Sequence, residues 1–402
     1  MAKSIKAVLL GLSALVVIFV VAGGLGVRAA SNEGAYRQLG VYSEVLSRVR
    51  SEYVEEPNVA QVTDGALHGL LEALDANSSY LNPTEYKQFK EHKNDGKAGI
   101  GAAVSKRFGY GAIISVLPNG PAAKAGVEAG DIIEAIDGRS TREMSLAELR
   151  TLLSGQQGSN VALSIVRARR AEPSKIVVTR DIVNPPPVSE KMLDDGIGYI
   201  KAEALTKGKA QEIAGDIKRL QHGGAKKLIL DLRNSAEGEQ SEGVAVANLF
   251  LDHGTIAYVQ GQKYPRETFT ADPAKAMTKL PLVVLVNRGT AGPAEIVAAS
   301  ILENARGDVV GDKTFGVGSI QKIIEVQDGS ALILSVAKYY TPSGKAIQDA
   351  AVTPNILVAD KEDALDALDE DSSTAPPPQA AKPPQEDEQL KRAVEVLKQQ
   401  KA

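Results

Sequence analysis

The spacing of apolar residues changes twice along this chain, and each change indicates a different kind of fold. Residues 35–94 repeat apolar side chains at helical spacing, which predicts a small helical module. Residues 95–182 carry short β-branched runs separated by glycine, which predicts a compact β-rich domain with two short helices. Strand-like and helix-like segments alternate over 188–358, as in an α/β core with a mixed sheet. We therefore expect an α+β protein of several domains.

The N-terminal segment does not belong to these domains. Lys3 and Lys6 precede an uncharged apolar run at 7–27, and small residues follow it. This order is typical of a secretory signal, and roughly 20 apolar residues also suffice to cross a bilayer. A buried helix is the remaining alternative. We expect residues 1–30 to be a signal peptide or, as we favour, a membrane anchor. Either one makes the protein exported, as an inner-membrane or periplasmic protein, with the membrane as a partner.

The C-terminal part divides into a linker and a helix. Residues 359–386 are acidic and rich in proline, so we expect a disordered linker that cannot bury enough apolar surface to fold. Residues 387–400 regain helical spacing, with Leu390, Val394 and Leu397 on one face. The sequence thus predicts a C-terminal helix with an apolar side.

Charge and composition exclude several functions. The 46 Lys and Arg residues face 50 Asp and Glu residues, for a net charge of −4, which argues against nucleic-acid binding. The chain has no cysteine, so disulfides, thiol catalysis and cysteine-ligated zinc are excluded. The four histidines are scattered without metal-ligand spacing. We expect no metal site and no cofactor.

Five sequence blocks resemble known families. Residues 99–101 (Gly-Ile-Gly) and 121–131 together resemble a PDZ domain. Residues 231–234, 313–316 and 339–348 resemble the C-terminal processing peptidases, also called tail-specific proteases. The resemblance implies the fold of a serine peptidase family that uses a Ser/Lys dyad, with a PDZ domain before the protease core.

The PDZ resemblance implies a groove for polypeptide C-termini. Gly99 and Gly101 allow backbone N–H groups to converge on a terminal carboxylate. A ligand peptide then adds to the sheet edge as an extended strand. Ile100, Leu149 and Leu153 are candidates to line the pocket for its last side chain. The alternative is that the glycines form only a turn and the leucines only core.

The nucleophile position departs from the family pattern. In the family, the catalytic serine lies between a core strand and a helix, where helix N–H groups stabilise developing negative charge. Here the strand 282–286 is followed by Asn287 and a helix that begins at Pro293. Gly292 occupies the place of the serine, so this position has no side chain.

The base and the oxyanion loop depart as well. Val317 stands where the family has its general-base lysine, and only Gln321, the orienting residue, is kept. Family members have a glycine-rich loop after residue 234, which places an oxyanion-hole N–H on a glycine. This chain has Glu237 and Gly238 there, and the carboxylate of Glu237 would oppose negative charge.

No other residue is an evident substitute. Thr290, Ser300, Ser319 and Lys313 are each expected to serve as a cap, a core hydroxyl or a solvated cation. We therefore interpret the chain as a catalytically degenerate peptidase homologue that binds polypeptide C-termini as a regulator, adaptor or decoy. An active serine-type endopeptidase with a non-standard nucleophile is the alternative. Pairing with an active paralogue is a further hypothesis.

Overall fold

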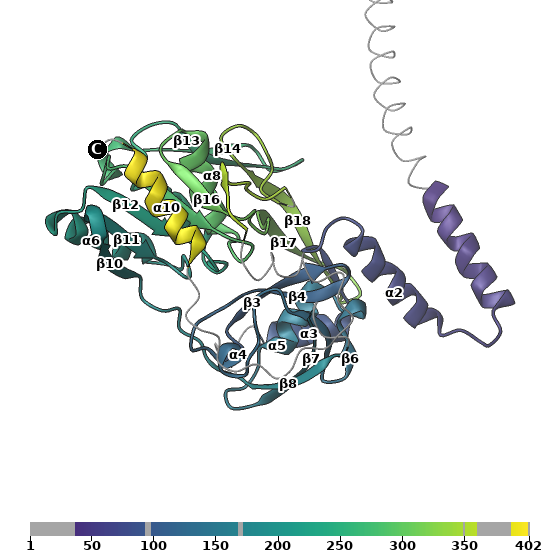
Figure 1. Ribbon diagram of the computed structural model, residues 1–402. Coiled ribbons are helices and arrows are strands. Elements are labelled where there is room, and N and C mark those ends of the chain that lie inside the picture. The colour runs from purple at the N-terminus through teal and green to yellow at the C-terminus, as the bar shows by residue number, and fades with distance from the viewer. Residues whose placement is uncertain (1–36, 93–97, 168–171, 349, 360–386, 401–402) are drawn as a thin grey trace, which may run out of the picture. The chain divides into compact units, whose positions relative to one another are not determined.

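The computed structural model describes residues 37–92, 98–167, 172–348, 350–359 and 387–400 (Figure 1). The predicted signal or anchor at 1–30 lies outside these residues, as does nearly all of the predicted linker at 359–386. No helix in the described ranges is long and apolar enough to cross a membrane. The chain divides into two compact units, one up to Leu67 and one from His68 onward.

The first unit is helical. Residues 37–52 form one helix, whose outer face carries ion pairs of Arg48 with Glu44 and Glu52. The second helix, α2 (Val59–Glu72), has its first nine residues in this unit and begins where the Asn58 side chain accepts a hydrogen bond from the N–H of Gln61 at 3.2 Å. Side-chain oxygens at this position stabilise the free N–H groups of a first helical turn.

The second unit begins with a short strand that the sequence pattern does not reveal. Strand β1 (Ser79–Leu81) pairs with β18 (Ala331–Tyr340) of the core, and α3 (Pro83–His92) follows it. Leu81 and Tyr86 share a buried cluster with Ile333. Residues 79–92 therefore pack with the core, and the prediction of a separate helical module at 35–94 is wrong for this part. Three residues are too few to show an alternating pattern.

The β-rich domain has the predicted form. Its sheet order is β3-β4-β5-β7-β8, with β6 beside β5, and all pairs are antiparallel. The two helices are α4 and α5, and Ser145 caps α5 by accepting from the N–H of Glu148 at 3.2 Å. The elements are β2 (Ala98–Gly99), β3 (Ala102–Arg107), β4 (Tyr110–Val116), α4 (Pro121–Lys124), β5 (Ile132–Ile136), β6 (Arg139–Ser140), η1 (Thr141–Glu143), α5 (Leu146–Leu153), β7 (Asn160–Val166), β8 (Ser174–Thr179) and β9 (Asp181–Ile182).

The core contains a six-stranded mixed sheet of order β10-β11-β12-β15-β16-β19. Only β10 runs antiparallel to its neighbour. The elements are β10 (Ser189–Leu193), η2 (Asp194–Gly196), β11 (Ile197–Lys201), α6 (Lys209–His222), β12 (Lys227–Asp231), α7 (Gln240–Asn248), β15 (Leu282–Val286), α8 (Pro293–Glu303), β16 (Asp308–Gly311) and β19 (Ile356–Leu357). Helices α6, α7 and α8 share a buried cluster with one face of this sheet.

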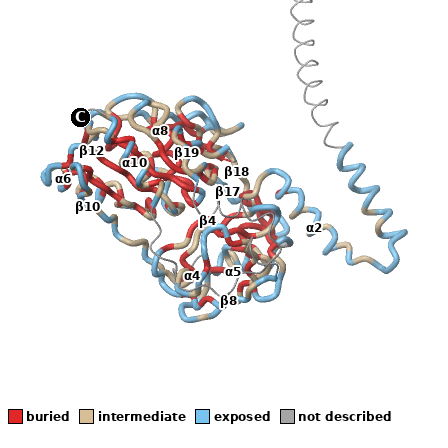
Figure 2. Tube along the Cα trace, viewed as in Figure 1, coloured by how far each residue is buried: buried red, intermediate tan, exposed pale blue. Residues whose placement is uncertain are grey.

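The other face of this sheet packs against the C-terminal helix α10 (Glu388–Gln399) (Figure 1). The inner strands are buried on both faces, as Figure 2 shows by their colour. Parallel strands that are covered on both faces have continuous apolar sequences. Strand β15, with the sequence Leu-Val-Val-Leu-Val, has this pattern.

A second sheet of order β1-β18-β13-β14 completes the core, with β17 also paired to β18. Its remaining elements are β13 (Thr255–Gln260), β14 (Glu267–Thr270), η3 (Pro273–Lys275) and β17 (Ser319–Glu325). Strands β17 and β18 pair antiparallel as a hairpin.

Candidate active site and peptide groove

The turn from β15 to α8 places Gly292 at the start of the helix. Its backbone has φ +61° and ψ −119°, a left-handed conformation that glycine adopts readily. A Cβ atom at this position would have space, because its nearest neighbour is Nε2 of Gln240 at 3.6 Å. The site thus keeps a sharp strand-to-helix turn and room for a side chain, but the side chain is absent.

A buried carboxylate joins the two positions of the expected dyad. Oε2 of Glu295 accepts hydrogen bonds from the N–H of Gly292 at 2.9 Å and of Val317 at 2.8 Å. Oε1 accepts from the N–H of Gly316 at 2.8 Å and from the Thr314 hydroxyl. Burial raises the pKa of Glu295 to about 7, although these four hydrogen bonds lower it. The nucleophile and base positions are therefore neighbours, held by one side chain.

Neither Gly292 nor Val317 carries a reactive group, and the side chain of Gln321 is bonded to a different part of the chain. Val317 presents a half-buried apolar side chain. Gln321 is exposed, and its amide donates a hydrogen bond to the carbonyl of Asn77. Gln321 thus connects β17 to the turn before β1.

The loop at the oxyanion position is fixed by its backbone. The N–H of Leu205 donates to the carbonyl of Glu237 at 2.8 Å, and Leu205 forms a parallel bridge with Gly238. Gly238 has φ +135°, and a Cβ there would overlap the carbonyl of Leu205. Burial raises the pKa of the half-buried Glu237. Only glycine fits at position 238, whereas position 237 carries an acidic group.

Two of the hydroxyls considered as substitutes have structural partners. The Thr290 hydroxyl donates to the carbonyl of Leu232 at 2.8 Å, and that of Ser300 donates to the carbonyl of Val297 at 2.9 Å. Both residues are completely buried. Ser319 differs, because it lies opposite Lys338 in the β17–β18 ladder.

The Gly99–Gly101 loop follows β2, in which Gly99 pairs with Asp181 of β9. Gly101 has φ +72°, and a Cβ there would contact Pro121 at 3.2 Å. The carbonyls of Ile100 and Gly101 accept from the N–H groups of Ala122 and Leu117, at 2.7 and 2.9 Å. The loop is therefore held in place through its carbonyls.

The side chains expected to line the peptide pocket lie in the core of the β-rich domain. Ile100, Leu149 and Leu153 are 3%, 0% and 4% exposed and belong to one buried cluster. The accessible side of α5 is the adjacent one, which carries Arg150, Thr151 and Ser154. A helical stripe at i, i+3 and i+7 indicates the core side, so sequence spacing alone does not identify the groove side.

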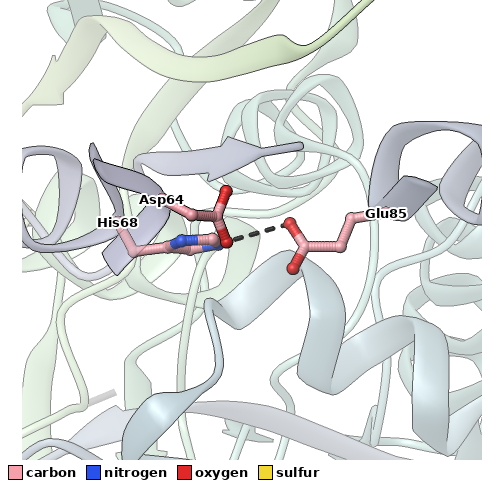
Figure 3. A group of neighbouring side chains, drawn as sticks. All are labelled: Asp64, His68 and Glu85. Carbon is pink, nitrogen blue, oxygen red and sulfur yellow. Dashed lines mark ion pairs between the residues drawn. The ribbon is translucent and has the colours of Figure 1, made fainter. Parts of the chain in front are cut away.

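A histidine–carboxylate pair lies away from these loops. Nε2 of His68 and Oε2 of Glu85 are 3.3 Å apart (Figure 3). The pKa of Glu85 lies below its ordinary value. Burial raises this pKa, but the hydrogen bonds with His68 and with the N–H of Asn82 together lower it by more. Since Glu85 accepts from the N–H of Asn82 at 2.9 Å, the pair fixes the first turn of α3.

Comparisons with known proteins agree with the two domains. The model of "Peptidase family S41" matches residues 196–358, and the PDZ domain model matches residues 113–167. A carboxy-terminal-processing protease of Bartonella bacilliformis is 32% identical over 333 residues, which cover 82% of this chain and 76% of the relative. The chain belongs to peptidase family S41. The sequence-based resemblance to the C-terminal processing peptidases is confirmed.

Two other S41 relatives show the same extent of similarity. The carboxy-terminal processing protease CtpA of Bacillus subtilis is 33% identical over 316 residues, which cover 78% of this chain and 67% of the relative. The solved structure of the photosystem II D1 C-terminal processing protease aligns with a TM-score of 0.66 at 28% identity. That alignment covers 78% of this chain and 86% of the other. The predicted fold, a PDZ domain with an S41 core, is confirmed.

Sequence reasoning did not anticipate the role of Glu295 in this S41 member. Its signal was present, because an acidic residue three positions after a helix cap often accepts from backbone N–H groups. The contacts to Gly316 and Val317 come from a loop more than twenty residues later and have no local signature.

Proposed function

We propose that this S41 member does not hydrolyse peptide bonds and that it binds polypeptide C-termini through its PDZ domain, as a regulator, adaptor or decoy. The observation that carries the first part is the convergence of the Gly292 and Val317 N–H groups on Glu295. The two dyad positions lie together, and neither has a hydroxyl or an amine.

The chemistry of amide hydrolysis supports this proposal. A Ser/Lys mechanism needs a hydroxyl nucleophile and a neutral amine to take its proton. Without both groups, only the stabilisation of the oxyanion by N–H donors remains. In this chain Pro293 removes one helix N–H, and Glu237 places an acidic group in the loop. Both changes weaken even that contribution.

A cleavage assay tests the inactive centre. The full chain is incubated with unstructured peptides of varied C-termini and, separately, with a fluorophosphonate probe. The CtpA relative from Bacillus subtilis serves as the positive control. We expect neither turnover nor labelling. Turnover that disappears in Ser319→Ala would contradict the proposal and favour the alternative, an active serine-type endopeptidase, because Ser319 faces Lys338 across the ladder.

Peptide binding is tested independently of catalysis. We expect the full chain to bind peptides that end in a free carboxylate after an apolar residue. Amidating the peptide removes the charge, so affinity should fall by about tenfold or more. Gly101→Pro should weaken binding similarly, because φ +72° is closed to proline. Circular dichroism checks that this variant folds. Equal affinity for peptides with a free and with an amidated C-terminus would contradict the proposal that the site binds the terminal carboxylate.

The location of the protein is part of the same proposal. Lys3, Lys6 and the apolar run at 7–27 support export, with residues after 30 outside the cytoplasm and the membrane as a partner. A reporter that is active only in the cytoplasm, fused after residue 60, should give no signal. A bright fusion would exclude this topology. Pairing with an active paralogue is tested by co-purification of the two chains.

A further inference from the structure

Three side chains with metal-binding atoms lie together on α2 and α3. One ligand atom each from Asp64, His68 and Glu85 lies within 4.8 Å of the other two, as Figure 3 shows for the three side chains. All three residues are partly buried. None of them belongs to the dyad positions or to the Gly99–Gly101 loop, so the cluster has no role in the activity or the binding described above.

The local structure holds these side chains in place. Asp64 and His68 are four residues apart on α2, so they lie on one side of a continuous helix. Oε2 of Glu85, in the first turn of α3, accepts from the N–H of Asn82 at 2.9 Å. The ring of His68 packs edge-on against that of Tyr80, with centroids 5.3 Å apart. Contacts of this kind orient the ligands of a metal ion.

The distance between two of the ligand atoms fits a shared ion. Nε2 of His68 and Oε2 of Glu85 are 3.3 Å apart, which is longer than the roughly 2.7–3.2 Å of an N–H···O hydrogen bond. Two ligands of a tetrahedral zinc ion, each about 2.0–2.1 Å from the metal, lie about 3.3 Å from one another. The spacing therefore matches two ligands of one ion better than it matches a direct hydrogen bond.

The charge and the donor atoms indicate which ion is suitable. Two carboxylates and a neutral imidazole carry two negative charges, which a divalent cation neutralises, and buried charges are either paired or bound to metals. Arg139 also acts on Glu85, but its own charge is paired with Glu148. Calcium and magnesium prefer oxygen ligands alone, whereas zinc binds imidazole nitrogen and carboxylate oxygen. Three protein ligands leave the fourth position of zinc to water.

We propose that Asp64, His68 and Glu85 bind Zn²⁺ and that the ion joins α2 to the first turn of α3. The ion binds the folded chain and not the unfolded one, so it stabilises this part of the fold. The spacing of the histidines does not reveal such a site, because only one ligand is a histidine and Glu85 comes from a later helix.

Calorimetry tests this inference with the full chain, prepared without a histidine tag and freed of metal by a chelator. We expect one equivalent of Zn²⁺ to bind. His68→Gln and Glu85→Gln should each weaken binding at least tenfold. His253→Gln is the matched control, because His253 is an exposed histidine 2.5 Å from the carboxylate of Asp252. It should bind Zn²⁺ like the unmodified chain.

Thermal unfolding gives a second measurement. Zn²⁺ should raise the Tm of the unmodified chain and of His253→Gln, but not that of His68→Gln. Circular dichroism checks that each variant folds. If His68→Gln does not fold, Asp64→Asn replaces it, since this change keeps the shape of the side chain and removes its charge. It should weaken Zn²⁺ binding about tenfold.

Three results would overturn the inference. The first is a full chain that binds no Zn²⁺. The second is a folded variant at any of the three proposed ligands that binds Zn²⁺ as tightly as the unmodified chain. The third is a loss of affinity in His253→Gln, which would place the ion beside Asp252 instead.

Discussion

Burying the carboxyl group of Glu295 costs free energy, and the hydrogen bonds around it explain how the two segments of the site are held together. A fully buried carboxylate loses its hydration, and only hydrogen bonds offset that loss. Here three backbone N–H groups and one hydroxyl converge on it. The same bonds tie the start of α8 to the 314–318 loop. The geometry of the site is thus maintained by hydrogen bonds to one buried side chain.

The raised pKa of Glu295 makes a prediction about stability and pH. Its folded pKa of about 7 lies above the ordinary glutamate value of roughly 4.3. As pH rises, the unfolded chain therefore loses this proton before the folded chain does. The contribution of Glu295 to the free energy of unfolding is fully present below about pH 4 and is lost as pH rises toward 7. We expect the free energy of unfolding to fall by up to about 3 kcal/mol over that range on account of this group.

Urea unfolding at pH 5 and pH 8 measures this dependence. Glu295→Gln is neutral at both pH values, so its stability should change less between them than that of the unmodified chain. The matched control is Glu239→Gln, since Glu239 is exposed and makes no side-chain cap. It should keep the full dependence. Identical behaviour of the unmodified chain and Glu295→Gln would show that this carboxyl does not titrate in the range.

Gly238 gives a second prediction at the residue scale. Gly238→Ala forces a Cβ against the carbonyl of Leu205 in addition to the strain of positive φ. We expect a loss of about 3 kcal/mol or more, because backbone must move. Gly126→Ala is the control, since Gly126 also has positive φ but nothing within 4 Å of the added atom. It should cost only about 1 kcal/mol. Similar losses in thermal unfolding would contradict the steric argument.

At the scale of elements, the C-terminal helix closes one face of the mixed sheet. Ala393 and Leu397 of α10 pack on residues of β11, β12 and β15, and both are completely buried. Arg233, after β12, pairs with Asp387 at 2.8 Å and with Asp231 at 2.6 Å. The helix is therefore fixed by apolar contacts and by an ion pair at its N-cap residue, Asp387.

Leu397→Ala tests how much this packing contributes. Removing a fully buried leucine costs the transfer of the side chain and leaves a cavity, so we expect a loss of about 2–4 kcal/mol. Gln399→Ala, on the exposed side of α10, should change stability by less than about 0.5 kcal/mol. Chemical denaturation measures both. A Leu397→Ala variant as stable as the control would mean that α10 does not contribute to folding.

The elements also show what sequence patterns predict and what they do not. Strand β15 is found with the predicted boundaries, 282–286, because a short β-branched run between turn residues is a local signal. Strand β1 is too short for such a signal, and only its pairing with β18 defines it. The positions of Gly292 and Val317 follow from motifs, whereas their junction through Glu295 joins segments that are far apart in sequence. Long-range contacts of this kind have no local pattern.

At the scale of the whole molecule, a PDZ domain and an S41 core are present, with glycine at position 292 and valine at position 317. The fold is stabilised by its buried sheet faces, and none of that stability depends on a nucleophile or a base. The proposed loss of activity is therefore compatible with an intact fold, because function resides in the site and not in the architecture. This reasoning predicts that the scaffold can accept the missing groups again.

The double variant Gly292→Ser with Val317→Lys tests that prediction in the full chain. A Cβ at Gly292 has space, although its φ and ψ cost a serine about 1–3 kcal/mol. The lysine enters a half-buried position, where desolvation lowers its pKa toward the neutral form that a base needs. We expect the double variant to react with a fluorophosphonate probe, as detected by mass spectrometry, and each single variant to stay unlabelled. Gly292→Ala with Val317→Lys is the matched control without a hydroxyl. A folded double variant that reacts no faster than this control would show that the geometry of the site, and not only its side chains, has diverged from catalysis.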